Sequence, residues 1–574
     1  MDTKDVARLI VIACITGGVP LHFLDNFYLR KAFEVVQLNV AGRAPFVPTS
    51  ASTAYAMRDL EAVRAADNTR KWAEQSGFGT LALDGRLMSE GRYKECMLNC
   101  AFVSRGQEHY MRSEDMSGVF KDTANVSEFV EASFAEGENR NHPHPAPSIH
   151  AKHVAAVCLD QPAVNVAALK LLREKWPNIA DIPCQFHGLD GIIGHLVVKI
   201  GVLSCTRVMC KVETRFFNNQ SRVRSEMRMI QKRRVQRKAD ATGRKVRMYN
   251  FIKPRKSRSY PILQTVKRCL QLNSNAAAFF KGEKAQELAG NHKHFAAMKR
   301  FCCTNRALSL RRIRVFYDLL GPVLRKMRLV DTTRTSSFPQ TMLRLCDLKG
   351  KMTDAWLERR SDFDCIKPGC EDEYTKNLRT ITKECNTSFK KMVNHWVLAA
   401  HLVDQFHIEL YAVEVAGHGP LGLEEDFSTD ETMPASLDDP KVHRTFAFYA
   451  RRAMYTIIEI SMAKARRQLD QYLGQHGVFD KRKAVARGFW EDAKFDAMKD
   501  DARGRETPLW TLWARDEMNA PELQAIMQQL ASIWPAQSAS ERANALVKHV
   551  TGDPTQNSFS MKARVHCCQI ADHY

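Results

Sequence analysis

Three short segments between residues 78 and 116 are rich in apolar and β-forming side chains and are separated by turns that contain glycine. The segments are 78–87, 93–104 and 108–116, with Gly91 and Gly106 in the turns. Short runs of this kind, joined by glycine turns, are typical of consecutive antiparallel strands. The pattern therefore predicts a three-stranded antiparallel unit.

The residues that follow alternate between helical and strand patterns up to about residue 200. Residues 122–136 and 165–176 have the spacing of helices, and a further helix is predicted to end near 200. Compact apolar runs at 154–160 and 182–187 predict two more strands. The order β-β-β-α-β-α-β-α indicates a mixed sheet covered by helices, which makes this part of the chain α/β.

Helical patterns dominate on both sides of this α/β unit. An apolar run at 9–15 is too short to span a bilayer, so no membrane partner is expected. Beyond 200 the strand pattern disappears, and an acidic loop rich in Gly and Pro interrupts the helices at 414–440. The pattern predicts four parts: a helical N-terminal region (1–76), the first part of an α/β core (77–200), a helical insertion (201–520) and a C-terminal region (521–574).

The charge of the chain changes this picture, because it is strongly basic. Lys and Arg number 85 and Asp and Glu 64 among 574 residues, which gives a formal charge of +21. Fifteen basic residues fall within 222–258, against only Glu226 and Asp240. Such a cluster favours binding to the phosphates of DNA, although a solvated helix face is the alternative. The candidate DNA-binding residues are Arg228, Lys232, Arg233, Arg234, Arg237, Lys238, Arg255 and Lys256.

Part of the same cluster has a second interpretation. Residues 232–238 read KRRVQRK, which also fits a nuclear localisation signal. The sixteen cysteines contain no CxxC pair and no regular framework, which favours reduced thiols inside a cell. We therefore expect a nuclear protein.

Two carboxylates lie in or at the end of apolar strands in the predicted sheet. Asp84 lies in TLALDG at 80–85, and Asp160 ends AVCLD at 156–160. A carboxylate in such a place is costly to bury unless it faces a polar crevice or a metal ion. Oxygen ligands on neighbouring strands suit Mg²⁺ or Mn²⁺. The alternative is that an Asp before Gly is only a turn residue.

Several stretches, taken in order, resemble the hAT superfamily of transposases. The resemblance spans about residues 5–565 and rests on the combination of motifs rather than on any one of them. The stretches are LDGR at 83–86, LNCAFVS at 98–104, SEDMSGVFKD at 113–122, LDQPAVN at 159–165, PCQFHGLD at 183–190 and SASERA at 538–543.

The resemblance implies a fold and an activity. The fold would be α/β plus α, a ribonuclease-H-like mixed sheet interrupted by a large all-helical insertion. Asp84, Asp160 and Glu541 would hold Mg²⁺ or Mn²⁺ for cut-and-paste DNA transposition, and 521–574 would complete the core and dimerise. The Ser538-to-Glu541 spacing is also typical of an ordinary helix N-terminus.

The Cys-x-x-His of the family corresponds to Cys184 and His187. We expect a structural pair, a buried thiol beside a hydrogen-bonded imidazole. A zinc site is the alternative, but the sequence offers no clear second pair of ligands.

Departures from the family pattern leave the activity open. Arg86 stands where the family has Trp, and Lys256 stands where a Trp stacks on a flipped base. That stacking is worth roughly 1–3 kcal/mol, which Lys cannot supply. No BED-type zinc finger precedes the core. The departures favour a domesticated or degenerate transposase. Three other functions compete with it: a Mg-dependent nuclease, a non-catalytic DNA-associated or protein-interaction scaffold, and a helical scaffold that does not bind nucleic acid.

Overall fold

The structure is a computed structural model in which most of the chain is described. The described residues are 3–16, 19, 21, 24, 51–88, 95–115, 122–134, 149–160, 162–243, 248–252, 261–331, 338–403, 453, 454, 457, 465–480, 482, 483, 509–514, 519–534, 536, 567, 568, 570 and 571.

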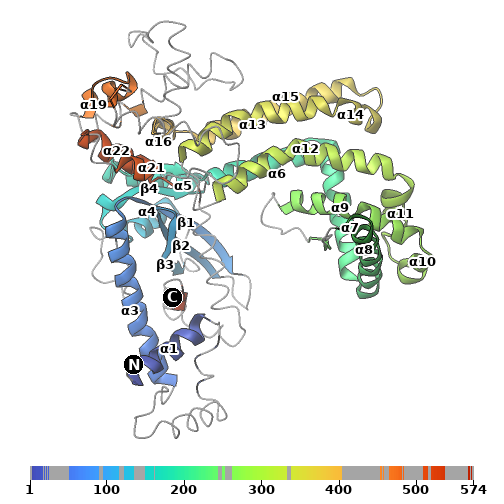
Figure 1. Ribbon diagram of the computed structural model, residues 1–574, viewed down its shortest axis with the longest axis horizontal. Coiled ribbons are helices and arrows are strands. Elements are labelled where there is room, and N and C mark those ends of the chain that lie inside the picture. The colour runs from blue at the N-terminus through green and yellow to red at the C-terminus, as the bar shows by residue number, and fades with distance from the viewer. Residues whose placement is uncertain are drawn as a thin grey trace.

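One five-stranded mixed sheet lies at the junction of the described helices (Figure 1). Its order is β3-β2-β1-β4-β5. β1 and β2, and β2 and β3, pair antiparallel, whereas β1 and β4, and β4 and β5, pair parallel. The strands are β1 (Gly79–Met88), β2 (Glu95–Ser104), β3 (Gln107–Asp115), β4 (Val154–Leu159) and β5 (Ala180–Pro183). The predicted order of strands and helices is therefore confirmed, and so is the α/β plus α class.

Both faces of the sheet are covered, which explains the composition of its central strands. All six residues of β4, VAAVCL, are buried, as expected for a parallel strand packed on both sides. Leu81 and Val157 pack on one face with helices α4 (Thr123–Glu131) and α5 (Ala163–Lys175). Ala82 and Cys158 belong to the larger core on the opposite face, which includes helix α6 (Gln185–Lys199).

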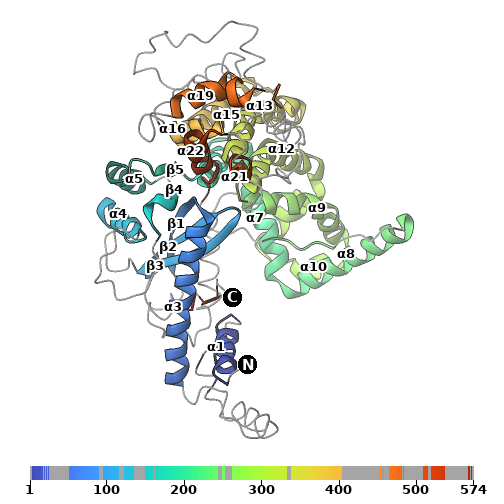
Figure 2. The ribbon, with the colours of Figure 1, turned by 60° about the vertical axis from the view of Figure 1, so that its left-hand side comes forward.

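Long helices carry the chain away from the sheet to a second cluster of helices (Figures 1 and 2). The core is continuous along them, from Ala82 in β1 to Phe301. The elements of this helical region are α7 (Gly201–Asn219), α8 (Ser221–Thr242), α9 (Pro261–Lys281), α10 (Lys284–Ala289), α11 (Phe295–Lys299), the π-helical turn η4 (Arg300–Thr304), α12 (Arg306–Asp331), α13 (Phe338–Glu358), α14 (Arg360–Ile366), α15 (Glu371–Met392) and α16 (His395–His401).

The remaining helical elements lie near the two ends of the chain. Val11, Ile12 and Ile15 of α1 are buried, as predicted for the apolar run at 9–15. Among the described residues no single helix is long and apolar enough to cross a membrane, although α6 and α7, bent by 98°, meet that criterion as a pair. These elements are α1 (Thr3–Thr16), α3 (Ala51–Ser76), η3 (Ala151–His153), α19 (Ala465–Leu473), η5 (Gly477–Phe479), α21 (Leu509–Trp513) and α22 (Pro521–Ala531).

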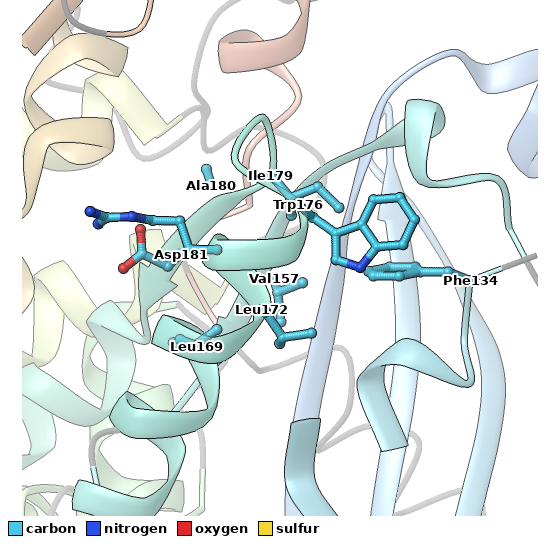
Figure 3. Close-up of a pocket in the computed structure, with 9 residues that line it drawn as sticks. Phe134, Val157, Leu169, Leu172, Trp176, Ile179, Ala180 and Asp181 are labelled. Carbon is cyan, nitrogen blue, oxygen red and sulfur yellow. The ribbon is translucent and has the colours of Figure 1, made fainter. Parts of the chain in front are cut away.

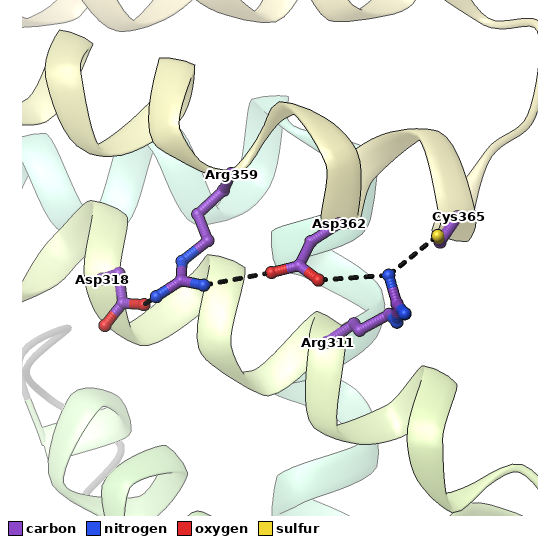
Figure 4. A network of polar contacts seen from close by, with 5 residues as sticks. All are labelled: Arg311, Asp318, Arg359, Asp362 and Cys365. Atoms are coloured by element: carbon purple, nitrogen blue, oxygen red, sulfur yellow. Dashed lines mark hydrogen bonds and ion pairs between the residues drawn. The ribbon is translucent and has the colours of Figure 1, made fainter.

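A chain of polar contacts holds α12, α13 and α14 together (Figure 4). Arg359, just after α13, forms ion pairs with Asp318 of α12 at 2.6 Å and with Asp362 of α14 at 3.2 Å. Arg311 of α12 reaches the same Asp362 at 3.3 Å and donates to the Cys365 sulfur at 2.8 Å. Exposed ion pairs are individually weak, so the apolar contacts beneath them supply most of the stabilisation.

Two predicted elements have different limits in the structure. The strand predicted at 182–187 ends at Pro183, and α6 begins at Gln185 with Cys184 as its N-cap. The Cys184 N–H still donates to the Leu159 carbonyl of β4 at 3.0 Å, and the chain turns into α6 directly afterwards. The burial of Phe186, Leu189, Ile192 and Ile193 has helical spacing, which a six-residue window does not reveal. The helix predicted at 122–136 ends earlier, at Glu131.

A C-terminal segment returns to the sheet and contacts β1. The Thr80 hydroxyl donates to the Ser532 carbonyl at 3.2 Å and accepts from the Trp534 backbone N–H at 2.8 Å. Thr80 is fully buried, so neither bond is replaced by water. Residues about 450 positions apart are thereby joined at the centre of the sheet.

We predict that Thr80→Val destabilises this junction by about 1–3 kcal/mol, because it leaves a buried N–H and a buried carbonyl unsatisfied without changing the volume of the side chain. The measurement is hydrogen exchange of residues 521–534 together with the urea unfolding midpoint. Thr380→Val is the control, since its hydroxyl bonds only to Lys376 within an exposed helix turn. Unchanged exchange in Thr80→Val would contradict the assigned role.

Candidate functional site

Asp84 lies in the middle of β1, and it is 8% exposed. It stands opposite Asn99 of β2, which in turn stands opposite Ser113 of β3. The Ser113 hydroxyl donates to the Asn99 side-chain oxygen and lies 2.6 Å from the Tyr110 hydroxyl. A row of polar side chains thus crosses three strands next to Asp84.

Asp160 immediately follows β4, the parallel neighbour of β1. The pairing of the two strands ends at Ala82 opposite Cys158. Asp84 and Asp160 are each two residues beyond that pair. The structure therefore brings these two predicted site residues to the same edge of the parallel part of the sheet, at the carboxyl end of β4.

This edge is the place where the chain changes direction across the sheet. From β1 the chain proceeds through β2 and β3 on one side, and β4 and β5 continue on the other. In open α/β sheets, ligands bind in the crevice outside the carboxyl ends of the strands at such a switch point. The position of Asp84 and Asp160 is therefore one at which sheets of this kind commonly bind ligands.

Asn165 in the first turn of α5 positions the Asp160 carboxylate. Its side-chain N–H donates to Asp160 Oδ1, and Asn165 is itself 2% exposed. The Asn165 Oδ1 atom is buried and has no hydrogen-bond partner among the described residues. Asn165 belongs to the LDQPAVN stretch at 159–165, but its contact with Asp160 depends on how α5 packs, and the sequence does not predict it.

A cavity of about 420 Å³ opens beside Asp160. It lies between α5, the ends of β4 and β5, and the link from α15 to α16. Its lining includes the carboxylates of Asp160 and Asp181. It also includes three cationic side chains, Lys170, Arg173 and Lys391. The cavity therefore combines carboxylates with cations that suit a phosphate.

Asp181 of β5 is the second acidic group of this cavity. Figure 3 shows its carboxylate at the outer end of a packed interior that contains Val157, Leu172 and Trp176. Burial raises the pKa of Asp181, and nearby Arg173 partly offsets that effect. One carboxylate oxygen of Asp181 lacks a hydrogen-bond partner among the described residues.

Several predicted residues lie outside the described part of the chain. They are Glu541, Arg255, Lys256 and the acidic loop 414–440. The backbone of Arg86 belongs to β1, but its side chain is outside the description. The structure therefore brings together two of the three predicted carboxylates and leaves the third as a prediction.

Six of the eight basic residues predicted to bind DNA lie on α8, and all six are exposed. All eight basic residues of this helix are exposed, whereas Val223, Met227 and Gln231 are buried. The buried side packs against α9 and α10. The helix is amphipathic, as predicted. The exposed basic residues are Arg222, Arg224, Arg228, Lys232, Arg233, Arg234, Arg237 and Lys238.

Cys184 and His187 are in contact at the start of α6. The His187 Nδ1 atom lies 3.2 Å from the Cys184 sulfur, and Cys184 is fully buried. Within the described residues, the groups that could hold a metal with three or more ligands do not include this pair. They consist of Cys210, Glu213 and Cys269 in the helical region, which the sequence analysis did not single out.

His395 begins α16 beside the cavity and is held in its neutral form. Burial lowers the pKa of His395 to about 4 from 6.5, and Arg173 contributes in the same direction. Between these pH values the unfolded chain takes up a proton that the folded chain does not. Neutral His395 therefore contributes to the free energy of unfolding above about pH 6.5, and this contribution is lost as the pH falls toward 4.

We predict that His395→Gln removes about 1–2 kcal/mol of the stability difference between pH 6.5 and 4, a value reduced from the full shift because the ring is partly exposed. The measurement is the urea midpoint at several pH values, with the exposed His476→Gln as control. Parallel pH profiles for the wild-type chain and His395→Gln would be evidence against this effect.

No protein-family model matches this chain, and no curated protein matches it either.

Proposed function

We propose that this chain is a DNA-binding, transposase-like protein whose candidate activity is metal-dependent cleavage and transfer of DNA strands. Its core would be ribonuclease-H-like, with Asp84, Asp160 and Glu541 as the ligands of Mg²⁺ or Mn²⁺. The observation that carries the proposal is that Asp84 and Asp160 lie on neighbouring parallel strands of a single sheet, both at the carboxyl end of β4.

The topology of the sheet supports the proposed fold. An antiparallel β1-β2-β3 unit is extended by parallel β4 and β5 on the other side of β1. This is the order expected of a ribonuclease-H-like sheet. The helical region that begins at Gly201 corresponds to the proposed insertion.

The length of chain between Trp534 and Glu541 permits the third carboxylate to approach the other two. Trp534 contacts Thr80, and Thr80 precedes Asp84 by four residues on the same strand. Four strand residues span about 13 Å. Glu541 is seven positions after Trp534, which corresponds to a fully extended reach of about 25 Å. The extended reach from Trp534 to Glu541 exceeds the span from Thr80 to Asp84, which is compatible with Glu541 as the third ligand.

The residues of this site have defined tasks in the proposed chemistry. A pair of hard divalent ions would supply an activated water and stabilise the attacking and leaving oxygens. The two Asp carboxylates bind through oxygen, the donor type that Mg²⁺ and Mn²⁺ prefer. Asn165 orients the Asp160 carboxylate, and Lys170, Arg173 and Lys391 offer cations for a phosphate beside it.

The exposed basic surface of α8 supports the DNA partner. Its cations exceed the two acidic residues of the helix, Glu226 and Asp240, by six. Cations in such a row release counterions from a phosphate backbone on binding. Arg255 and Lys256 would extend the surface, the KRRVQRK segment at 232–238 would direct the protein to the nucleus, and 521–574 would form a homo-oligomer.

A second candidate is a non-catalytic DNA-associated protein that retains the same fold. The replacement of the family's Trp residues by Arg86 and Lys256 favours it. This alternative keeps the basic surface of α8 but does not require a catalytic ion. The two candidates differ in metal binding and strand cleavage, not in DNA affinity.

We predict that Asp84→Asn and Asp160→Asn each reduce Mn²⁺-dependent nicking of DNA about a hundredfold or more, because each removes a charge that stabilises the metal ions of the transition state. Asp67→Asn, an exposed change on α3, is the control. Fe²⁺ with ascorbate and peroxide should also cut the backbone near residues 84, 160 and 541, and excess Mg²⁺ should suppress the cuts.

These readouts separate the candidates. Equal nicking by the wild-type chain and Asp84→Asn would remove the assigned site. Iron-dependent cuts near 84 and 160 but not near 541 would remove Glu541 as a ligand. No nicking and no cuts would leave the non-catalytic candidate.

We predict that the triple change Lys232→Gln, Arg233→Gln, Arg237→Gln weakens binding to any duplex and lowers the slope of log affinity against log salt by about 2–3, since each lost phosphate contact contributes about 0.9. The measurement is fluorescence anisotropy at several salt concentrations. The matched control replaces Lys376, Arg379 and Lys383, three exposed cations of α15, with Gln. An equal loss in both triple variants would mean that only net charge matters and that α8 is no dedicated surface.

A further inference from the structure

Four side chains with metal-binding atoms meet in the interior of the helical region, away from the sheet. Cys210 and Glu213 lie on α7, Cys269 on α9 and Cys302 on the π-helical turn η4. All four have 0% exposure. Three separate segments of the chain therefore deliver thiols and a carboxylate to one dry location.

The distances between the donor atoms are close to those of a metal site. The ligand atoms of Cys210, Glu213 and Cys269 lie within 4.8 Å of one another. The Cys302 sulfur lies 3.7 Å from Glu213 Oε1. In a tetrahedral zinc site with metal–sulfur bonds of about 2.3 Å, two sulfur ligands lie about 3.8 Å apart. Three of the four ligand atoms are thus already grouped, and Cys302 adjoins them through Glu213.

The carboxylate of Glu213 is incompletely satisfied. Its Oε2 atom is buried and has no hydrogen-bond partner among the described residues. Its contacts in the cluster are with thiols, which are weak donors. A buried carboxylate in apolar surroundings is costly unless a proton or a cation compensates it.

We propose that Cys210, Glu213, Cys269 and Cys302 form a structural site for a thiophilic divalent ion, with zinc as the expected occupant. Thiolates select zinc over Mg²⁺ or Mn²⁺. A closed shell of four protein ligands is typical of structural rather than catalytic zinc. Binding deprotonates the thiols and releases their protons to solvent. The proposal is independent of the proposed function.

The position of the site gives it a mechanical role. It joins α7, α9 and the turn that connects α11 to α12. A π-helical turn widens the helix locally, and such turns are frequent at functional positions. Here the turn carries Cys302 toward α7. The ion would fix the packing of the helix cluster that also supports α8.

The competing account is a neutral, hydrogen-bonded cluster without an ion. In that state burial raises the pKa of Glu213 to about 7 and raises the pKa of Cys302 well above its ordinary value. The Cys269 sulfur then donates to the Cys210 carbonyl at 3.7 Å. The two accounts differ in bound metal and in the chemistry of the cysteines.

The first experiment measures zinc in the full chain. Protein expressed with added zinc and dialysed extensively should retain one zinc per chain by elemental analysis. The double variant Cys210→Ser, Cys269→Ser should lose it. The matched control Cys205→Ser, Cys303→Ser should retain it, because Cys205 is exposed on the same helix and Cys303 adjoins Cys302. Zinc retained by a folded Cys210→Ser, Cys269→Ser variant would overturn the assignment.

A second experiment needs no variant and covers the case in which the double variant does not fold. Cobalt added to the metal-free chain should give a thiolate-to-cobalt charge-transfer band and the strong visible absorption of tetrahedral cobalt. Chelation should make Cys210, Cys269 and Cys302 accessible to alkylation, as identified by mass spectrometry. Absence of bound zinc and of the cobalt band, or alkylation unchanged by chelation, would reject the site.

Discussion

Strands β1 and β4 exchange hydrogen bonds at the centre of the sheet, and the rest of the core is organised by that parallel pairing. It brings together segments more than seventy residues apart, so Asp84 and Asp160 emerge at the same edge. It also requires that other elements cover both faces of the sheet, since neither strand presents a polar side to water before the chain reaches these carboxylates. Helices α4 and α5 cover one face, and α6 with the helical region covers the other.

The strands could be predicted because their signals are local. Each lies in a short apolar run bounded by Gly, Pro or a carboxylate, and the parallel pairing of β4 follows from its uninterrupted burial. The limits of β5 could not be predicted, because IPCQFH at 182–187 fits either a strand or a helix. The strand ends at Pro183 only in the context of the sheet. The contact of Asn165 with Asp160 depends on the angle of α5, and the contact of Thr80 with Trp534 spans most of the chain.

The same limit applies to the cysteine cluster. Cys210 and Glu213 share a helix face by their three-residue spacing, but Cys269 and Cys302 reach them only through the packing of α7, α9 and η4. The two candidate metal sites also differ in donor chemistry. The sheet edge offers carboxylate oxygens beside a cavity, whereas the helix interior offers thiols in a dry environment. The carboxylate oxygens therefore favour hard ions at the sheet edge, and the thiols favour thiophilic ions in the helix interior.

Electrostatics links the proposed metal and DNA functions. Asp84 and Asp160 repel a phosphate backbone when no cation lies between them, and Lys170, Arg173 and Lys391 offset that repulsion on only one side, at the cavity. A divalent ion at the sheet edge would turn repulsion into attraction. Under the proposed function, ion binding strengthens DNA binding at this edge, and by thermodynamic reciprocity DNA strengthens ion binding by the same factor. The basic surface of α8 belongs to a different element, so its contribution to affinity persists without the ion.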